Sequence, residues 1–362
     1  MIFATLPMLG HYAGLGMYRV PGKDCPMAKK TKITLPDGRV VDGVERQGRA
    51  RGSVKDAGPP RVVPEISESR TPPQPPTLAM PEAPRQSDAF TIATYDGVKA
   101  VQSVLINCGL LDPPADGGYG PVTKWALARF AERMGIALKD TITPELAIAL
   151  QKAEPLPLTP GEDLAGKLIK AMLRNNYWIA RYPDCVNIAY IEGINPDGSL
   201  NDNRNNVFND LRVVFSIQND GIPVLLGSWE ATTEPSRRWT LKPMDPHGAF
   251  HIKFGQYKAW IRGWHHTHEA LVQAGEIEGY RDPHKTFRRD FNYPVSGADF
   301  GVNQHWGYDL PHDDMGNSSA GCLVGRTTEG HRKFISLVLG DPRYCANSAY
   351  RFVTAILPAG DL

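Results

Sequence analysis

The sequence predicts an α+β protein of several domains, in which a small three-helix bundle precedes a mainly β domain. Two observations favour this class. Apolar residues recur at helical spacing between residues 95 and 153, whereas from about residue 187 apolar runs are joined by turn-forming residues. A stretch rich in Pro, Arg, Ser and Glu sets the N-terminus apart. We therefore expect segments with the boundaries 1–44, 45–90, 91–154, 155–205 and 206–362.

The segment 1–44 is expected to hold a small hairpin around Asp37-Gly38. Residues 1–15 lack a basic start and are broken by Gly10, which is untypical of a secretory signal peptide. Met27-Ala28-Lys29-Lys30 is typical of a second translation start, so we hypothesise that residues 1–26 are not native. The segment 45–90 is interpreted as a disordered proline-rich linker, with a polyproline ligand as the alternative.

Three helices are expected in the bundle. Val98, Val101 and Leu105 follow helical spacing in the first. A turn-rich loop follows, and a second helix begins near Thr123. Thr143-Pro144-Glu145 predicts the start of the third, because Thr caps helices and Pro is tolerated at the first helical position.

The loop and second helix of this bundle resemble peptidoglycan-binding domains of the three-helix type. They share the family's Asp-Gly-x-aromatic-Gly-x-x-Thr core, and Ala131 departs from it where the family usually has glutamine. The resemblance implies peptidoglycan as a partner. The alternative is a unit that only packs against the following domain. The matching residues are Val101-Gln102, Gly109-Leu110, Asp116 to Thr123, Ala126 and Phe130.

The segment 155–205 is expected to form a short linker and an amphipathic helix over Glu162 to Tyr177. Asn219-Asp220-Gly221 then separates two apolar runs, which predicts a β hairpin. The runs 248–254 and 257–263 are expected to pair with each other. Three further elements complete the domain: a strand from Phe300 to His305, a helix from Thr328 to Leu339 and a strand from Tyr350 to Leu357.

A histidine and a cysteine follow in the last third of the chain. His305 precedes Cys322 by 17 residues, and the cysteine ends the turn Ser319-Ala320-Gly321-Cys322. A thiol with an ordinary pKa of about 8.5 needs a base to become a nucleophile, and its attack on a carbonyl needs donors for the oxyanion. A glycine lets backbone N–H groups approach a ligand closely. The structural alternative is a buried cysteine beside an unrelated histidine.

This arrangement resembles the catalytic core of the L,D-transpeptidase (YkuD-like) family, whose domain is a β sandwich or half-open barrel. The resemblance covers roughly residues 210–357, and the specific motif lies within 301–326. It implies acyl transfer on the peptide stem of peptidoglycan, without a cofactor. The implied site has Cys322 as nucleophile, His305 as general base oriented by the carbonyl of Trp306, the N–H groups of Gly321 and Cys322 around the oxyanion, and Ser319 in the turn.

Two positions depart from that family. Ala320 stands where a second histidine is usual, and Val324 where an arginine is usual, and whether Arg326 takes over the role of that arginine is open. Trp306, Tyr308 and Arg326 are expected substrate contacts, with core packing as the alternative for the aromatic residues. An amine acceptor would give transpeptidation, and water would give carboxypeptidase or endopeptidase action. The departure at Ala320 leaves this choice open.

Two other interpretations remain. His265 and His268, spaced i and i+3 on an expected helix, could bind zinc with Asp282 or His305 as a third ligand, as in a zinc-dependent peptidoglycan hydrolase. The lead interpretation needs no metal. The other alternative is a non-enzymatic wall-binding or phage-particle-associated protein with a degenerate catalytic domain, since Ala320 replaces a family histidine.

Composition limits the partners. The net charge of +1 does not favour nucleic-acid binding, and no apolar run reaches the roughly 18 residues of a membrane span. The 5 cysteines are widely spaced, which is untypical of a zinc ribbon or a disulfide framework. We expect a place in the periplasm or cell wall, with delivery by a phage or another signal-independent route, as for a phage lysin.

Overall fold

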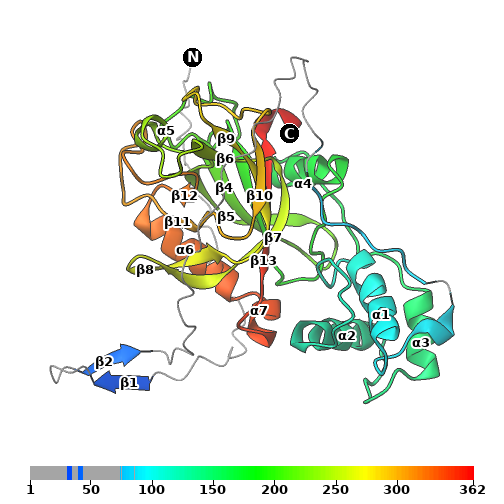
Figure 1. Ribbon diagram of the computed structural model, residues 1–362. Helices are drawn as coiled ribbons and strands as arrows, with labels where there is room; N and C mark the ends of the chain where they lie inside the picture. Colours follow the sequence, from blue (N-terminus) through cyan, green and yellow to red (C-terminus); the bar gives the residue numbers. More distant parts are fainter. Residues whose placement is uncertain (1–30, 35–39, 44–73, 75, 85) are drawn as a thin grey trace, which may run out of the picture. The chain divides into compact units, whose positions relative to one another are not determined.

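The computed structural model describes residues 31–34, 40–43, 74, 76–84 and 86–362 (Figure 1). The chain divides into two units, residues 1–62 and 63–362. In the first, β1 (Thr31–Thr34) and β2 (Val40–Gly43) pair antiparallel, as expected of a hairpin. The predicted non-native start 1–26 and the disorder predicted for 45–73 lie outside the described residues.

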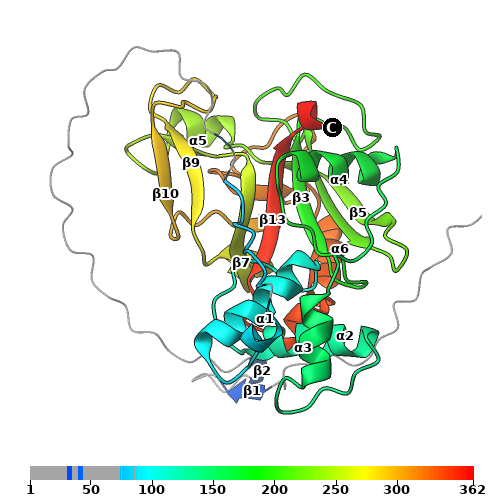
Figure 2. The ribbon, with the colours of Figure 1, turned by 90° about the vertical axis from the view of Figure 1, so that its right-hand side faces the viewer.

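The second unit begins with the helical bundle (Figure 2). Side-chain caps start two of its helices, because Thr94 accepts a hydrogen bond from Gly97 N and Thr143 accepts one from Leu146 N. Pro121 opens the remaining helix, where its missing N–H costs no hydrogen bond. The three predicted helices are α1 (Tyr95–Asn107), α2 (Pro121–Arg133) and α3 (Pro144–Gln151), after the 3₁₀ turn η1 (Ser87–Ala89).

Gln102 holds the loop between α1 and α2. Its Nε2 donates to Asp116 Oδ1 at 2.7 Å and to Thr123 Oγ1 at 3.1 Å, while its Oε1 accepts from Gly117 N at 2.7 Å. Gln102 is buried, so these bonds replace water. Gln102, Asp116, Gly117 and Thr123, four of the residues that resemble the peptidoglycan-binding family, therefore form one hydrogen-bond network.

A closed barrel follows the bundle, with the strand order β11-β12-β5-β4-β3-β13-β7-β8. Gln304 opposite Leu271 closes the ring. The α+β class is confirmed, but a closed barrel replaces the expected sandwich or half-open barrel. The barrel strands are β3 (Asn187–Glu192), β4 (Asp210–Ile217), β5 (Pro223–Thr232), β7 (Gly255–His265), β8 (His268–Gln273), β11 (Gln304–Trp306), β12 (Leu323–Gly325) and β13 (Phe352–Pro358).

The expected pairing of 248–254 with 257–263 is wrong. β6 (Ala249–Ile252) instead pairs with β9 (Ile277–Asp282), and β9 with β10 (Pro294–Gly297), in a separate three-stranded sheet. The strand that follows β6 in the sequence, β7, pairs with β13 and β8. Local apolar runs located β6 and β7, but they did not locate β9 and β10, and the choice of partner depends on long-range packing.

The helix expected at His265 and His268 is also wrong. The two residues face each other as the last pair of the β7–β8 hairpin. His266, with φ of 52°, makes the turn in a left-handed conformation that is more often occupied by Gly or Asn. Without those residues, the sequence does not signal the turn.

Four helices accompany the barrel. Asp163 caps α4 (Leu164–Arg174) by accepting from Gly166 N at 2.8 Å, within the predicted range. α6 (Thr328–Leu339) has its predicted bounds and buries Phe334 and Val338 against the strands. Because β3 precedes residue 206, the barrel begins earlier than the expected boundary of the last segment. The helical elements after the bundle that were not predicted are α5 (Arg237–Leu241), α7 (Pro342–Ala346) and the 3₁₀ turn η2 (Ala359–Asp361).

Part of the predicted linker contacts the barrel. Pro76 O accepts a hydrogen bond from Gln256 N at 2.9 Å, and Pro81 O accepts one from Asn107 Nδ2 at 3.2 Å. The segment 45–90 is thus anchored at its C-terminal end. Across the described residues, no helix combines the length and apolar character needed to cross a membrane.

Candidate active site

β11 and β12 run parallel and carry the predicted nucleophile and base. His305 lies opposite Val324, and Gln304 lies opposite Leu323. Successive side chains in a strand alternate between faces, so His305 and Val324 share one face while Gln304 turns to the other. Cys322 lies on the face of Val324, because both belong to one apolar cluster. The parallel pairing of β11 and β12 therefore brings Cys322 and His305 to the same side of the barrel wall.

The thiol of Cys322 is held between backbone groups. Its Sγ donates to Gly301 O at 3.5 Å and accepts from Asn303 N at 3.5 Å. The side chain is buried, and burial raises the pKa of Cys322 to about 11, although the Asn303 N–H acts in the opposite direction. In this resting form the group is a thiol rather than a thiolate.

The imidazole of His305 is fully buried. Its Nδ1 lies 2.7 Å from Trp306 O, the contact expected from the family resemblance. This contact assigns the proton to Nδ1 and leaves Nε2 as an acceptor. Nε2 has no hydrogen-bond partner in the described part of the chain, Cys322 Sγ included. Burial, followed by the neighbouring His265, lowers the pKa of His305 well below its usual value, so the ring is neutral.

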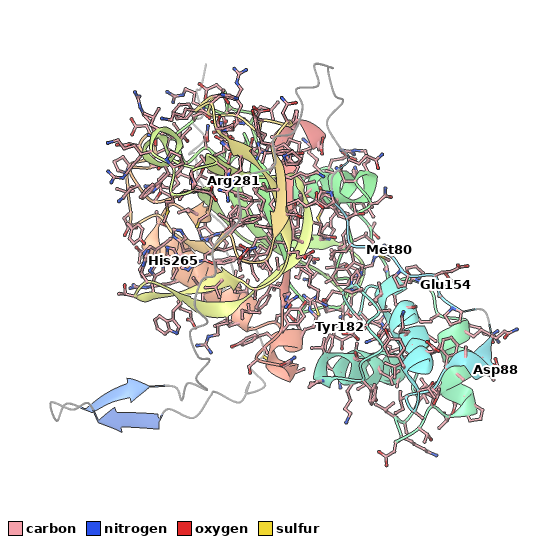
Figure 3. The ribbon with its side chains drawn as sticks, in the orientation of Figure 1. Met80, Asp88, Glu154, Tyr182, His265 and Arg281 are labelled. Atoms are coloured by element: carbon pink, nitrogen blue, oxygen red, sulfur yellow. The ribbon has the colours of Figure 1, made fainter. Side chains whose placement is uncertain are left out.

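A second imidazole lies against the first. The rings of His265 and His305 stack with centroids 3.9 Å apart and an interplanar angle of 8°. His265, labelled in Figure 3, comes from the β7–β8 hairpin. Asn303 Nδ2 lies 3.0 Å from His265 Nδ1, so Asn303 contacts Cys322 through its backbone and His265 through its side chain. Sequence reasoning missed Asn303. Its only signal is its place two residues before His305.

The turn before Cys322 is closed by Ser319. Its buried hydroxyl donates to Cys322 O at 3.0 Å and accepts from Gly321 N at 3.2 Å. Gly321 has φ of +120°, and a Cβ there would lie 2.6 Å from Phe250 O, so no other residue fits without strain. Two N–H groups were expected at the oxyanion. That of Gly321 is engaged by Ser319, whereas that of Cys322 has no acceptor among the described residues.

The three residues expected to contact the substrate lie in different surroundings. Trp306 stacks on His268 with ring centroids 3.9 Å apart, in the wall between β8 and α6. Arg326 pairs with Glu230, and its Nη1 donates to Leu310 O at 3.3 Å, so it holds the loop before Cys322. Tyr308 is 46% exposed, and burial together with the charge of Cys322 raises its pKa. Of the three, Tyr308 is the exposed one, and its ring centroid lies 6.3 Å from that of His305.

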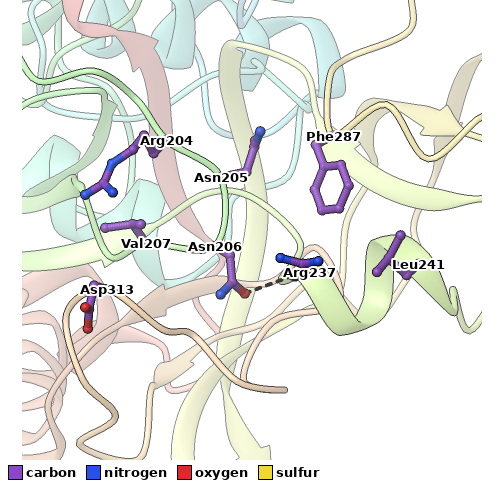
Figure 4. A pocket seen from close by; sticks show the side chains of 8 residues that line it. All are labelled: Arg204, Asn205, Asn206, Val207, Arg237, Leu241, Phe287 and Asp313. Carbon is purple, nitrogen blue, oxygen red and sulfur yellow. Dashed lines mark hydrogen bonds between the residues drawn. The ribbon is translucent and has the colours of Figure 1, made fainter.

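Helix α5 is tied to the cysteine turn. Ser236 N donates to Ser319 O at 2.8 Å, and Trp239 Nε1 donates to Asn317 O at 2.9 Å. One cavity of about 460 Å³ reaches this turn at Ala320 and is also lined by Trp239, Phe250, Arg281 and Asp299. A second, of about 500 Å³, is lined by Arg204, Asn205, Asn206, Val207, Arg237, Leu241, Phe287 and Asp313 (Figure 4).

The histidines do not fit the expected zinc site. A metal lies in the plane of each imidazole that binds it, but the stacked rings of His265 and His305 lie in nearly parallel planes. Asp282, an expected third ligand, is buried and accepts from Thr286 N at 2.9 Å and Phe287 N at 2.8 Å. In the ranges that the structure describes, no three His, Cys, Asp or Glu side chains are placed to hold a metal.

A buried carboxylate cluster was not predicted. Glu192 is paired with Arg289 through both carboxylate oxygens, and Asp210 accepts from Thr233 N at 2.7 Å. Burial would raise the pKa of Glu192, but Arg289 lowers it to about 2. Burial and the charge of Glu192 raise the pKa of Asp210 to about 7 and that of Glu234 to about 8. These residues are far apart in the sequence, so no sequence motif predicts the cluster.

Comparison with known families bears on the helical bundle. Residues 94–140 match the peptidoglycan binding domain family. The bundle is a peptidoglycan-binding domain. Peptidoglycan is thus the partner that this domain indicates, and the cell wall is its setting.

Other comparisons add little. No curated protein matches the chain. One solved structure, a fused Zn-dependent amidase/peptidase/peptidoglycan-binding domain-containing protein from Clostridium acetobutylicum ATCC 824, is similar over 72% of this chain and 94% of that chain. Its sequence identity is 15% and its TM-score is 0.22, a value that carries no argument about fold or chemistry.

The peptidoglycan-binding domain is bonded to the barrel through Asp112. This fully buried carboxylate pairs with Lys258 of β7, lies 3.7 Å from Arg343 Nη1 and accepts from Tyr350 Oη at 2.9 Å. Burial alone would raise the pKa of Asp112, but Lys258 and Arg343 hold it below its usual range. Trp178 Nε1 adds a bond to Ile106 O at 3.1 Å. The joint is therefore a structured interface.

Proposed function

We propose that this chain is a peptidoglycan-acting cysteine acyl-transfer enzyme of the L,D-transpeptidase type. The observation that carries the proposal is the parallel pair of β11 and β12, which holds Cys322 and His305 on one face, with Nε2 of His305 unpartnered among the described residues. The peptidoglycan-binding domain supports the choice of polymer.

The chemistry begins with proton transfer. Cys322 Sγ leaves Gly301 O and gives its proton to His305 Nε2, and the thiolate attacks a carbonyl carbon of the stem peptide. The oxyanion accepts a hydrogen bond from the Cys322 N–H. The tetrahedral intermediate collapses to a thioester as the leaving amine takes the proton from His305. An incoming amine or water then gives a proton to His305, attacks the thioester and releases the thiol.

Supporting residues keep this geometry. Ser319 fixes the turn, and Gly321 allows it to lie against Phe250. Tyr308 contacts the substrate at the exposed edge, and the cavity that reaches Ala320 accommodates the stem on the other side. The absence of an imidazole at position 320 leaves His305 as the base for both half-reactions. The enzyme acts at the cell wall or in the periplasm, after delivery by a phage or another signal-independent route.

The test uses purified muropeptides, with and without an added amine acceptor, and analysis by mass spectrometry. Wild-type protein is expected to change the stem peptide and to carry an acyl adduct on Cys322. Cys322→Ala should lose at least about 10⁴-fold in rate, as expected for removal of a nucleophile. Cys345→Ala, in the distant helix α7, is the matched control and should keep the activity.

A second candidate function is a non-enzymatic wall-binding protein. It is favoured by the burial of Cys322 and His305 and by the missing hydrogen bond between them. If folded wild-type protein leaves every muropeptide unchanged and forms no adduct, the enzyme proposal fails. Retained binding to wall sacculi would then support the second candidate.

A further inference from the structure

A cavity of about 400 Å³ lies between β8, β11 and α6, outside the cysteine turn. It is lined on one side by His268 and Trp306 and on the other by His331, Arg332 and Ser336. The apolar side chains of Ile335 and Leu339 complete the wall. The cavity is thus bounded by aromatic rings, polar groups and a small aliphatic surface.

Two of its polar groups lack partners. His268 is 4% exposed, and neither of its ring nitrogens makes a hydrogen bond within the described ranges. Trp306 Nε1 is buried and likewise has no acceptor there. By contrast, His331 uses both nitrogens, one near Arg212 Nη1 at 3.2 Å and one near Glu269 O at 2.9 Å.

Such groups are uncommon in folded proteins. More than nine-tenths of buried polar groups find a partner, because a buried group without one keeps its full desolvation penalty. Both residues line the cavity, so a ligand bound there would lie against their rings. The indole N–H can only donate, so it requires an acceptor.

The charge at the cavity is positive. Arg332 lies over the Trp306 ring at 5.7 Å, and it forms no ion pair in the part of the chain that is described. Glu269 also lines the cavity, but its carboxylate is paired with Arg262. Asp309 makes its hydrogen bonds with Thr328, accepting from Thr328 N and Oγ1, and not with Arg332. These bonds, and to a smaller degree the charge of Arg332, lower the pKa of Asp309. An anionic ligand would complement the free guanidinium.

We propose that this cavity binds a small ligand that carries a carboxylate. Its oxygens accept hydrogen bonds from Trp306 Nε1, a ring nitrogen of His268 and the Arg332 guanidinium, and its apolar part lies against Ile335 and Leu339. Guanidinium and carboxylate form strong paired hydrogen bonds, which makes a carboxylate the ligand that this set of donors recognises.

Occupancy would also affect His305. The carbonyl of Trp306 accepts the Nδ1 proton of His305, so a ligand on the Trp306 indole acts on the residue that orients the base. This coupling rests on the proposed function, whereas the binding site does not. A carboxylate at this cavity is therefore expected to change the reactivity of Cys322.

The probe is N-acetyl-D-alanine, with its neutral amide as the matched control and acetate as the simple carboxylate. Indole N–H resonances of the full chain are followed by NMR at constant ionic strength, and Trp306→Phe identifies the signal. N-acetyl-D-alanine should shift the Trp306 signal saturably, with a dissociation constant in the range of about 0.1–10 mM. The amide should not. Equal binding of acetate would mean that the carboxylate alone is recognised.

Two variants on α6 test the donor set. Arg332→Gln should weaken binding at least about tenfold, while Lys333→Gln, which removes the same charge from the next position, should change it less than about twofold. No saturable shift in the wild type, or equal effects of both variants, would overturn the site. Alkylation of Cys322 is then timed with and without the probe. Binding without any change in that rate would overturn the coupling alone, and neither result depends on muropeptide turnover.

Discussion

Two buried polar clusters of this protein differ in how fully their groups are paired. Around Asp112, at the joint between the peptidoglycan-binding domain and the barrel, the carboxylate meets two cations and a tyrosine hydroxyl. Around β11, His305 Nε2 and both ring nitrogens of His268 have no hydrogen-bond partners among the described residues. Both clusters are removed from water.

The difference distinguishes structural from chemical roles. A buried network whose charges are paired stabilises a fold and changes little with conditions. Buried groups without partners raise the free energy of the fold, so they persist where a substrate, a ligand or a proton completes them. We therefore expect variants at Asp112 to alter the stability of the fold, and variants of the histidines around β11 to alter the reactivity of Cys322.

The largest expected effect concerns the pH dependence of Cys322 alkylation. With its pKa raised to about 11 by burial, the thiol is the dominant form at neutral pH. The alkylation rate should rise about tenfold per pH unit, or about 10³-fold from pH 7 to 10, because only the thiolate reacts. Peptide mass spectrometry after iodoacetamide treatment measures it. A plateau near pH 8.5 would show that the thiolate is already stabilised.

Asp112→Asn should destabilise the chain by about 3–5 kcal/mol, because it leaves Lys258 and Arg343 near a buried neutral group. Urea unfolding measures the loss. The control is Glu329→Gln, which breaks the exposed pair with Lys333 and should cost less than about 1 kcal/mol. Similar losses in both variants would contradict the structural role of the Asp112 network.

His305→Gln should slow acyl-adduct formation on Cys322 by about a hundredfold or more, since a general base contributes in that range. Its unfolding free energy should change by about 1 kcal/mol, because the ring makes one hydrogen bond. His331→Gln is the matched control: both of its nitrogens are engaged, so it should lose stability without a comparable loss of rate. If His331→Gln loses the rate and His305→Gln loses the stability, the distinction between structural and chemical roles is wrong.

Gly321→Ala should have the smallest effect, a loss of about 1–3 kcal/mol from the strained backbone and the contact with Phe250 O. Gly301→Ala provides the control. Its φ is +70°, but no atom lies within 4 Å of the added Cβ, so strain alone costs about 1 kcal/mol. Thermal unfolding of both variants measures the difference, and equal losses would show that the fit against Phe250 is unimportant.

The sequence predicted elements whose signals are local. Thr143 caps a helix that begins at Pro144 as expected, and Asn219-Asp220-Gly221 joins β4 to β5 as a hairpin. It did not predict the pairing of β6 with β9 or the barrel closure at β11, because those contacts join residues far apart in the chain.

The same division holds for the candidate site. The family resemblance placed His305 and Cys322 in one site, and the parallel pairing of β11 and β12 is consistent with that placement. The stacking of His265 on His305 was not foreseen, because it depends on a β7–β8 turn at His266 that lacks the usual turn residues. The hydrogen bond from Gly321 N–H to Ser319 Oγ was not foreseen either, because it depends on the rotamer of Ser319.

The bonds of Asp112 and Trp178 also give the protein a fixed span. A wall-binding domain on a free tether samples many distances from its anchor, whereas a domain joined by a buried ion network keeps one. Under the proposed function, a domain that holds a glycan strand would keep Cys322 at one set distance from that strand. The separation of neighbouring strands in the wall, rather than the reach of a linker, would then decide which peptide stems come within range of Cys322.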